Sequence, residues 1–318
     1  MSTQLAIEAD GVRKHFPGRG AALDGLDLQV QPGVVHGVLG PNGAGKTTAV
    51  RILSTLQRLD AGRARVAGHD VGSSPAQVRA RIGVAGQYAA VDEILTGRQN
   101  LEMFARLNHL RPRAARNRSR ELLTRFDLAA AADRPAGQYS GGMRRRLDLA
   151  VSLIRSPQVL FLDEPTTGLD PRSRIQVWEA VRELSSTGTT VLLTTQYLEE
   201  ADRLCARITL LAAGRVAAEG TPTELKERIG TSRIEVAVPV GLDTYTIAGY
   251  LSAALDAPPE IDLDLDRVCV PVRGGAHALT QVARAMESAG LPMSAVSLRQ
   301  PDLDEVFLQL TAPEGVSE

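Results

Sequence analysis

The sequence predicts an α/β fold with a mainly parallel sheet, followed by a small α+β domain. Short apolar segments alternate with helical ones along much of the chain, as in strands joined by crossover helices. A glycine-rich loop separates the third expected strand from the first expected helix. Later the pattern changes to alternating β-branched residues, as at Ile234, Val236 and Val238. Because 318 residues exceed the usual size of one domain, we expect domains at 1–230 and 231–318.

The chain opens with strand signals and then enters a helix. Short apolar runs bounded by turn residues predict strands at 5–9, 26–30 and 34–39. The glycine-rich loop passes directly into an expected helix over 46–53. From about 96 to 150 the apolar residues recur at helical spacing. We therefore expect a helical subdomain to be inserted in this region.

Strands and helices then alternate up to the end of the first domain. Thr221 is the expected cap of a further helix, with Pro222 in its first turn. Strands are expected at 159–162, 190–193, 208–211, 216–219 and 268–272, and helices at 173–185, 198–204, 276–289 and 303–310.

Composition excludes several classes of function. The net charge of -1 gives no global reason to bind nucleic acid, and the arginine-dense segment 111–120 lacks interleaved aromatic residues. The two cysteines, Cys205 and Cys269, have no paired spacing, which favours a reducing compartment. No signal peptide and no apolar run of membrane-spanning length are evident. We expect a cytoplasmic protein that needs another chain to act across a membrane.

The glycine-rich loop has the spacing G-x-x-x-x-G-K-[ST] between a strand and a helix. Its glycines allow backbone N–H groups to surround phosphate oxygens, and the helix N-terminus adds partial positive charge. Lys46 would reach the terminal phosphates, and Thr47 would offer its hydroxyl to Mg²⁺. We therefore expect ATP and Mg²⁺ at a loop formed by Gly40, Pro41, Asn42, Gly43, Ala44, Gly45, Lys46, Thr47 and Thr48.

Two carboxylates follow the apolar run 159–162. A parallel sheet binds its ligands at the C-terminal edge, so Asp163 and Glu164 would lie at that edge. Successive side chains on a strand point in opposite directions. We expect Asp163 to approach Mg²⁺ and Glu164 to orient an attacking water as the general base.

The string YSGGM precedes a further helical segment. Ser140 is a favourable N-cap, and the glycines after it expose backbone N–H groups at a helix start. The chain here resembles the ABC ATPase family, whose signature motif it matches at Ser140, Gly141 and Gly142. It departs from the commoner LSGGQ form at Tyr139 and Met143. The resemblance implies a P-loop NTPase core and a head-to-tail homodimer, in which this motif closes over the γ-phosphate bound by the partner.

Other positions are assigned by the same resemblance. Gln87 looks like the Q-loop glutamine, which implies a contact with Mg²⁺ and a link to a transmembrane partner. Phe16 occupies the place of the aromatic residue that stacks on adenine, where tyrosine is commoner. Asp170 ends a string similar to the D-loop, which faces the opposite site of the dimer.

One position departs from the family pattern. Gln196 stands where a histidine is usual, and it would give a neutral hydrogen bond to the γ-phosphate. This glutamine and the block GQYAAVDEILTGRQNL are similar to the daunorubicin/doxorubicin-resistance type of ATP-binding subunit. The C-terminal string PDLDEVFLQLT resembles the tail of the same subfamily.

The function implied by the resemblance is ATP hydrolysis coupled to export of a hydrophobic drug or natural product. A separate multi-span ABC permease would carry the cargo, and the chain would lie on the inner face of the membrane. Two alternatives remain open: a soluble, non-transport ABC ATPase, and an importer ATPase with a regulatory C-terminal domain.

Overall fold

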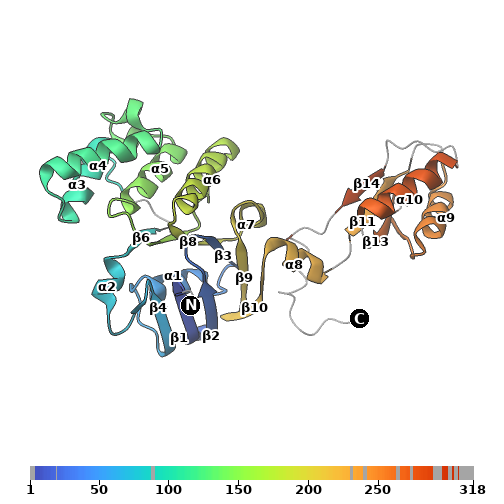
Figure 1. Ribbon diagram of the computed structural model, residues 1–318, viewed down its shortest axis with the longest axis horizontal. Helices are drawn as coiled ribbons and strands as arrows, with labels where there is room; N and C mark the ends of the chain where they lie inside the picture. Colours follow the sequence, from blue (N-terminus) through green and yellow to red (C-terminus); the bar gives the residue numbers. More distant parts are fainter. Residues whose placement is uncertain are drawn as a thin grey trace. The chain divides into compact units, whose positions relative to one another are not determined.

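The computed structural model describes residues 4–18, 20–86, 90–229, 232–238, 242–262, 266–272, 275–288 and 296–299, together with Leu303 and Phe307. The chain divides into two compact units, Met1–Pro222 and Thr223–Glu318. Each unit has its own sheets and helices (Figure 1). In the described part of the chain, no helix combines the length and the apolar character that crossing a membrane requires.

A six-stranded sheet forms the centre of the first unit. Five of its strands are parallel, and only β10 runs antiparallel to its neighbour β9. The α/β fold expected for this region is thus confirmed. In spatial order the strands are β10 (Arg215–Gly220), β9 (Arg207–Ala212), β3 (Val35–Leu39), β8 (Thr190–Thr195), β7 (Val159–Asp163) and β6 (Ile82–Ala85).

A second, antiparallel sheet of four strands lies beside the first. Residues 7–9 of the expected strand 5–9 begin β1, and the expected strand 26–30 ends β2. The last two strands of this sheet were not expected from the sequence. Only Ala64 and Val66 are buried in the first of these, so its apolar signal is weak. The order is β2 (Gly20–Val30), β1 (Ile7–Phe16), β4 (Ala61–Val66) and β5 (His69–Asp70).

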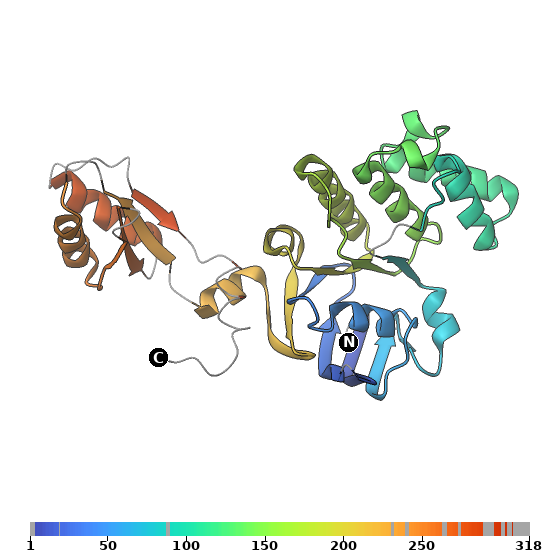
Figure 2. The ribbon, with the colours of Figure 1, turned by 180° about the vertical axis from the view of Figure 1, so that it is seen from behind.

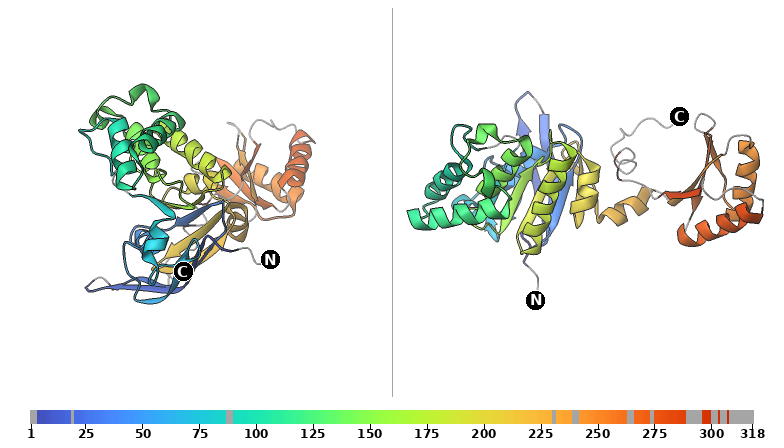
Figure 3. Two further views of the ribbon diagram at one scale, coloured as in Figure 1. Left: turned by 60° about the vertical axis from the view of Figure 1, so that its left-hand side comes forward. Right: turned by 90° about the horizontal axis from the view of Figure 1, so that it is seen from above.

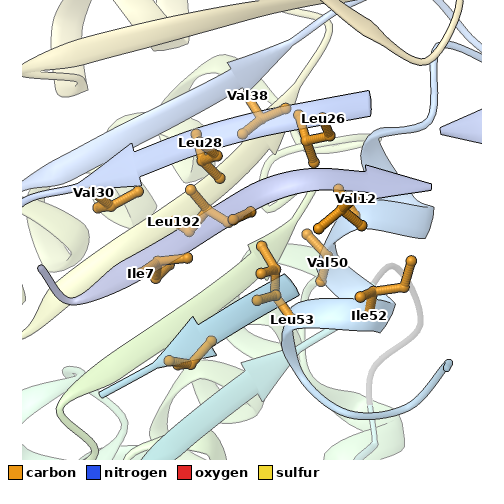
Figure 4. Close-up of a cluster of buried hydrophobic side chains, with 14 of the residues drawn as sticks. Ile7, Val12, Leu26, Leu28, Val30, Val38, Val50, Ile52, Leu53 and Leu192 are labelled. Carbon is orange, nitrogen blue, oxygen red and sulfur yellow. The ribbon is translucent and has the colours of Figure 1, made fainter. Parts of the chain in front are cut away.

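Helix α1 (Lys46–Leu53) contacts strands of both sheets. Its buried side chains Val50, Ile52 and Leu53 join a core cluster that includes residues of β1, β2, β3 and β8 (Figure 4). This apolar packing fixes the start of α1 against the ends of the central strands. The position of Lys46 is therefore set by the core of the unit.

Three helices occupy the region in which a helical subdomain is expected. They are α3 (Gly97–Leu107), α4 (Pro112–Arg125) and α5 (Gly141–Ser152), and they contact one another. The left-hand view of Figure 3 shows this group at one end of the unit, with the antiparallel strands at the other. Helix α2 (Pro75–Arg79) precedes β6, and helices α6 (Pro171–Ser186) and α7 (Leu198–Leu204) follow β7 and β8.

The second unit is a small α+β structure with an antiparallel sheet (Figure 2). Helices α9 (Thr244–Leu255) and α10 (Gly275–Ser288) pack on this sheet around Ile234, Val236 and Val268. The sheet order is β12 (Glu260–Asp262), β13 (Arg267–Val272), β11 (Ser232–Ala237) and β14 (Val296–Arg299). Helix α8 (Pro222–Ile229) precedes the sheet, and most of the helix expected at 303–310 lies outside the described residues.

Candidate functional site

Three neighbouring parallel strands bring several of the predicted residues to one edge of the central sheet. β8 lies between β3 and β7, and all three run in the same direction. The loop from Gly40 to Gly45 follows β3, Asp163 is the last residue of β7, and Gln196 follows β8. Residues more than 100 positions apart in sequence thus meet at the edge where open α/β sheets bind ligands.

The loop requires glycine for steric reasons. A Cβ atom on Gly40 would lie 2.3 Å from the carbonyl oxygen of Leu211, and one on Gly45 would lie 2.4 Å from that of Ala22. Gly45 also has φ +107°, which favours glycine over residues that carry a side chain. The loop backbone is therefore packed closely against its surroundings before α1 begins.

Lys46 is the first residue of α1, and its side chain is only 5% exposed. Its Nζ donates to the carbonyl oxygens of Gly40 at 2.8 Å and Pro41 at 3.1 Å, so the loop holds its own lysine in place. Glu164 Oε1 lies 3.9 Å from the same nitrogen. Burial lowers the pKa of Lys46, and the charges of Glu164 and Asp163 oppose this shift.

A pocket of about 370 Å³ opens over the loop and the start of α1. Phe16 forms part of its wall, and Lys14 Nζ lies 5.6 Å from the centre of the Phe16 ring. An aromatic face thus borders the same space as the phosphate loop. The lining residues are Phe16, Gly20, Ala21, Ala22, Asn42, Gly43, Gly45, Lys46, Thr47, Thr48 and Glu164.

Hydroxyl groups fix the first of the two carboxylates. Asp163 Oδ1 accepts hydrogen bonds from Thr194 Oγ1 at 2.6 Å and from Thr47 Oγ1 at 3.3 Å. Glu164 is not part of β7, because its backbone adopts φ +49° in the left-handed region. Strand alternation therefore does not apply to this pair, because Glu164 lies beyond the end of β7. The charges of both carboxylates act to raise the pKa of Lys46.

The residues of the signature motif lie at the start of α5, outside the pocket around Lys46. Ser140 caps α5, where its side chain accepts from the backbone N–H of Met143, and Gly141 and Gly142 form the first helical turn. Asp170 caps α6 and accepts from Ser173 N at 3.0 Å and Ser173 Oγ at 2.6 Å. None of these residues lines the pocket around Lys46 within this chain.

Of the two glutamines predicted for the site, the structure describes Gln196. Gln196 is exposed directly after β8, at the same sheet edge as Lys46 and Asp163. Gln87 lies outside the described residues.

Sequence reasoning missed three residues that support the site. Thr194 holds Asp163, while Arg145 and Asp148 form a buried ion pair at 3.2 Å on α5. Burial lowers the pKa of Arg145 and raises that of Asp148. The spacing of the pair, three residues apart in a helix, was a signal in the sequence, but it does not show that the pair is buried.

Comparison with known proteins gives concordant results. Residues 23–167 match the model of the family described as "ABC transporter". Over 96% of this chain and 95% of the relative, the sequence is 59% identical to the daunorubicin resistance ATP-binding protein DrrA2 of Streptomyces coeruleorubidus. It is 50% identical to the daunorubicin/doxorubicin resistance ATP-binding protein DrrA of Streptomyces peucetius, over 98% of this chain and 94% of the relative.

The structural comparison agrees with the sequence comparison. The fold resembles that of cbiO1 from Clostridium perfringens, part of the ABC transporter complex cbiONQ, with a TM-score of 0.65 and 25% identity. The match covers 70% of this chain and 90% of that one. With its phosphate loop, paired carboxylates and near full-length relatives, this chain belongs to the ABC transporter ATP-binding family, among the daunorubicin/doxorubicin resistance ATP-binding proteins.

Proposed function

We propose that this chain hydrolyses ATP to drive export of a hydrophobic drug or natural product through a separate membrane permease. The observation that carries the hydrolytic part is the geometry around Lys46. Its ammonium group donates to the loop carbonyl oxygens of Gly40 and Pro41, and Glu164 Oε1 lies 3.9 Å from Lys46 Nζ in the same pocket. The drug-export part rests on the relatives, which are named for daunorubicin and doxorubicin resistance.

The residues around Asp163 fit Mg²⁺. The hydroxyl of Thr47 and the carboxylate of Asp163 are hard oxygen donors within 3.3 Å of each other, which suits this ion. In this proposal Thr47, Asp163 and Gln87 hold the metal. Bound Mg²⁺ would neutralise part of the charge on the phosphate oxygens.

Lys46, Phe16, Glu164 and Gln196 each have one task in hydrolysis. Lys46 and the loop N–H groups bind the terminal phosphates, and Phe16 stacks against the adenine. Glu164 orients the attacking water and accepts its proton as the general base. Gln196 donates a neutral hydrogen bond to the γ-phosphate, which stabilises developing charge less than a protonated histidine would. We therefore expect slower turnover than a histidine at this position would allow.

We also propose that two copies assemble head to tail. Ser140, Gly141 and Gly142 present backbone N–H groups at the start of α5, yet they do not line the pocket of their own chain. In a head-to-tail dimer, the motif of one copy would lie over the γ-phosphate bound by the other copy. Asp170 would then lie at the dimer interface. Each site would then be completed by both chains.

Replacing Glu164 by glutamine tests the hydrolytic role. Glutamine keeps the shape of the side chain but cannot take the proton of the water, so phosphate release should fall by about 10²- to 10⁴-fold. Binding of a fluorescent ATP analogue should persist in Glu164→Gln and be lost in Lys46→Ala. Retained hydrolysis in Glu164→Gln would reject Glu164 as the general base.

A pull-down tests the transport role. The tagged full-length chain would be purified in mild detergent from membranes of its own host, with and without ATP, and an untagged host would serve as the control. Recovery of a multi-span membrane protein supports the export proposal and allows its cargo to be tested by efflux. Recovery of only ribosomal or DNA-repair proteins would instead favour a non-transport ABC ATPase.

A further inference from the structure

Arg145 on helix α5 contacts the backbone on both sides of Glu164. Its Nε donates to the carbonyl oxygen of Pro165 at 2.8 Å, and its Nη2 lies 3.4 Å from that of Asp163. The residue is only 8% exposed. A single guanidinium group therefore binds the carbonyl groups of the residues before and after the proposed general base.

Glu164 needs such support because its backbone conformation is unfavourable. With φ +49° it occupies the left-handed region, which residues with a side chain adopt only where their surroundings hold them. On the opposite side, the N–H of Glu164 donates to the carbonyl oxygen of Thr194 at 3.1 Å. Arg145 and Thr194 together fix the peptide groups that determine the direction of the Glu164 side chain.

Asp148 holds the guanidinium in its orientation. Its Oδ2 lies 3.2 Å from Arg145 Nη1, and its Oδ1 accepts from the backbone N–H of Ala90 at 2.9 Å. Arg145 Nη1 also donates to the carbonyl oxygen of Gly86 at 2.6 Å. Only the planar, multi-donor arginine side chain can make these bonds at once, whereas a lysine has one nitrogen at the end of a flexible chain.

We propose that Arg145, oriented by Asp148, is a positioning residue that holds Glu164 in its left-handed conformation. The inference rests on the proposed role of Glu164 as general base. Because Ser140 of the signature motif caps the same helix, a displacement of α5 would be transmitted to Glu164 through the hydrogen bonds of Arg145. The signature end of a chain and its own general base are thereby mechanically linked.

The variant Arg145→Lys tests this in the full-length chain. It keeps the positive charge but cannot reach the carbonyls of both Asp163 and Pro165, so Glu164 loses its fixed direction. The kcat for ATP should fall by about 10- to 100-fold, as expected for a misplaced catalytic group. The KM and the binding of a fluorescent ATP analogue should change by less than about twofold, since the Lys46 loop is untouched.

The adjacent Arg146 provides a matched control. It is 9% exposed and lies on the same helix, but its hydrogen bonds within the described residues go to Phe126 and Asp127. Arg146→Lys should lower the melting temperature while leaving kcat within about twofold of the wild type. An equal loss of kcat in both variants would mean that arginine at this helix is merely structural, and would overturn the inference.

A double variant adds a readout that a structural role would not produce. In the Glu164→Gln background there is no general base to misplace, so Arg145→Lys should cause no further loss of the residual rate. A further loss as large as that in the wild-type background would contradict the positioning role. If Arg145→Lys does not fold, the variant Asp148→Asn tests the proposal instead. The asparagine can still accept the hydrogen bond from the N–H of Ala90, but it lacks the negative charge that orients Arg145. The kcat should again fall while the KM is retained.

The two proposals fail in different ways. If Glu164→Gln hydrolyses ATP at the wild-type rate, the general base is misassigned and this inference falls with it. If Glu164→Gln is inactive while Arg145→Lys and Asp148→Asn both keep the wild-type kcat, the positioning role alone is overturned.

Discussion

At the residue scale, one buried histidine makes the stability of the first unit depend on pH. His36 lies on β3, directly before the phosphate loop, and is fully buried. Its Nε2 shares a hydrogen bond of 2.8 Å with Thr209 Oγ1, while its Nδ1 has no partner among the described residues. Burial lowers its pKa from 6.5 to about 4, and the nearby charge of Arg207 adds to the shift.

The direction of the pH dependence follows from that shift. The pKa of His36 is lower in the folded chain than in the unfolded chain. Above pH 6.5 the ring is neutral in both states, so its burial requires no loss of a proton. As the pH falls toward 4, the unfolded chain takes up a proton that the folded chain refuses. The free energy of unfolding should therefore drop over this window by up to about 3 kcal/mol, at 1.4 kcal/mol per pKa unit.

Denaturant unfolding of wild type and His36→Gln at several pH values tests this expectation. The variant can still bond to Thr209 but does not titrate, so it should lose less stability than the wild type between pH 6.5 and 4. Parallel profiles for wild type and His36→Gln would show that His36 does not cause the pH dependence.

At the element scale, helices α5 and α6 pack too closely for a side chain on Gly142. A Cβ atom there would lie 2.4 Å from Ser173 Oγ and 2.6 Å from Ser173 Cβ. Ser173 cannot easily move away, because its hydroxyl donates to Asp170 at 2.6 Å. The signature motif is therefore fixed against the start of α6 as well as capped by Ser140.

Gly142→Ala should overpack this contact and destabilise the chain by about 1–3 kcal/mol. Melting temperatures would measure the loss, at about 2–4 °C per kcal/mol for a unit of this size. Gly141→Ala is the matched control, because its Cβ would lie 3.6 Å from Leu169 Cδ2, an ordinary contact. Adding Ser173→Gly to Gly142→Ala should restore part of the loss, and equal melting of the two alanine variants would contradict the steric explanation.

Elements with a strong apolar period could be predicted from the sequence, and those stabilised by their neighbours could not. The expected helices at 46–53 and 198–204 match α1 and α7. Strand β4 was missed because its arginines alternate with small residues and, of its six residues, only Ala64 and Val66 are buried. Helix α9 was missed as well, because its threonines, tyrosines and isoleucine are not strong helix formers.

The same limit applies to the site. The loop around Lys46 and the pair Asp163 and Glu164 are contiguous strings, so spacing alone marks them. Arg145 stands in a run of three arginines, and its burial depends on how α5 is turned toward the ends of β6 and β7. Nor could strand alternation foresee the left-handed backbone of Glu164, which depends on contacts made by distant residues.

At the scale of the whole molecule, the two units have separate hydrophobic cores. Among the described residues, those of the core cluster around α1 belong to the first unit. The described residues that cluster around Ile234 and Val268 belong to the second unit. Since a domain is stabilised mainly by its own buried apolar surface, we expect the two units to unfold as separate cooperative transitions.

Calorimetry of the full-length chain with and without MgATP tests this independence. The nucleotide pocket is lined by residues of the first unit, so saturating MgATP should raise only one transition. At 100 times the dissociation constant the stabilisation is about 2.7 kcal/mol. A fragment ending at Gly230 should show that transition alone, with the same response to MgATP. A single transition in the full-length chain that shifts as a whole with MgATP would instead mean that the units unfold as one.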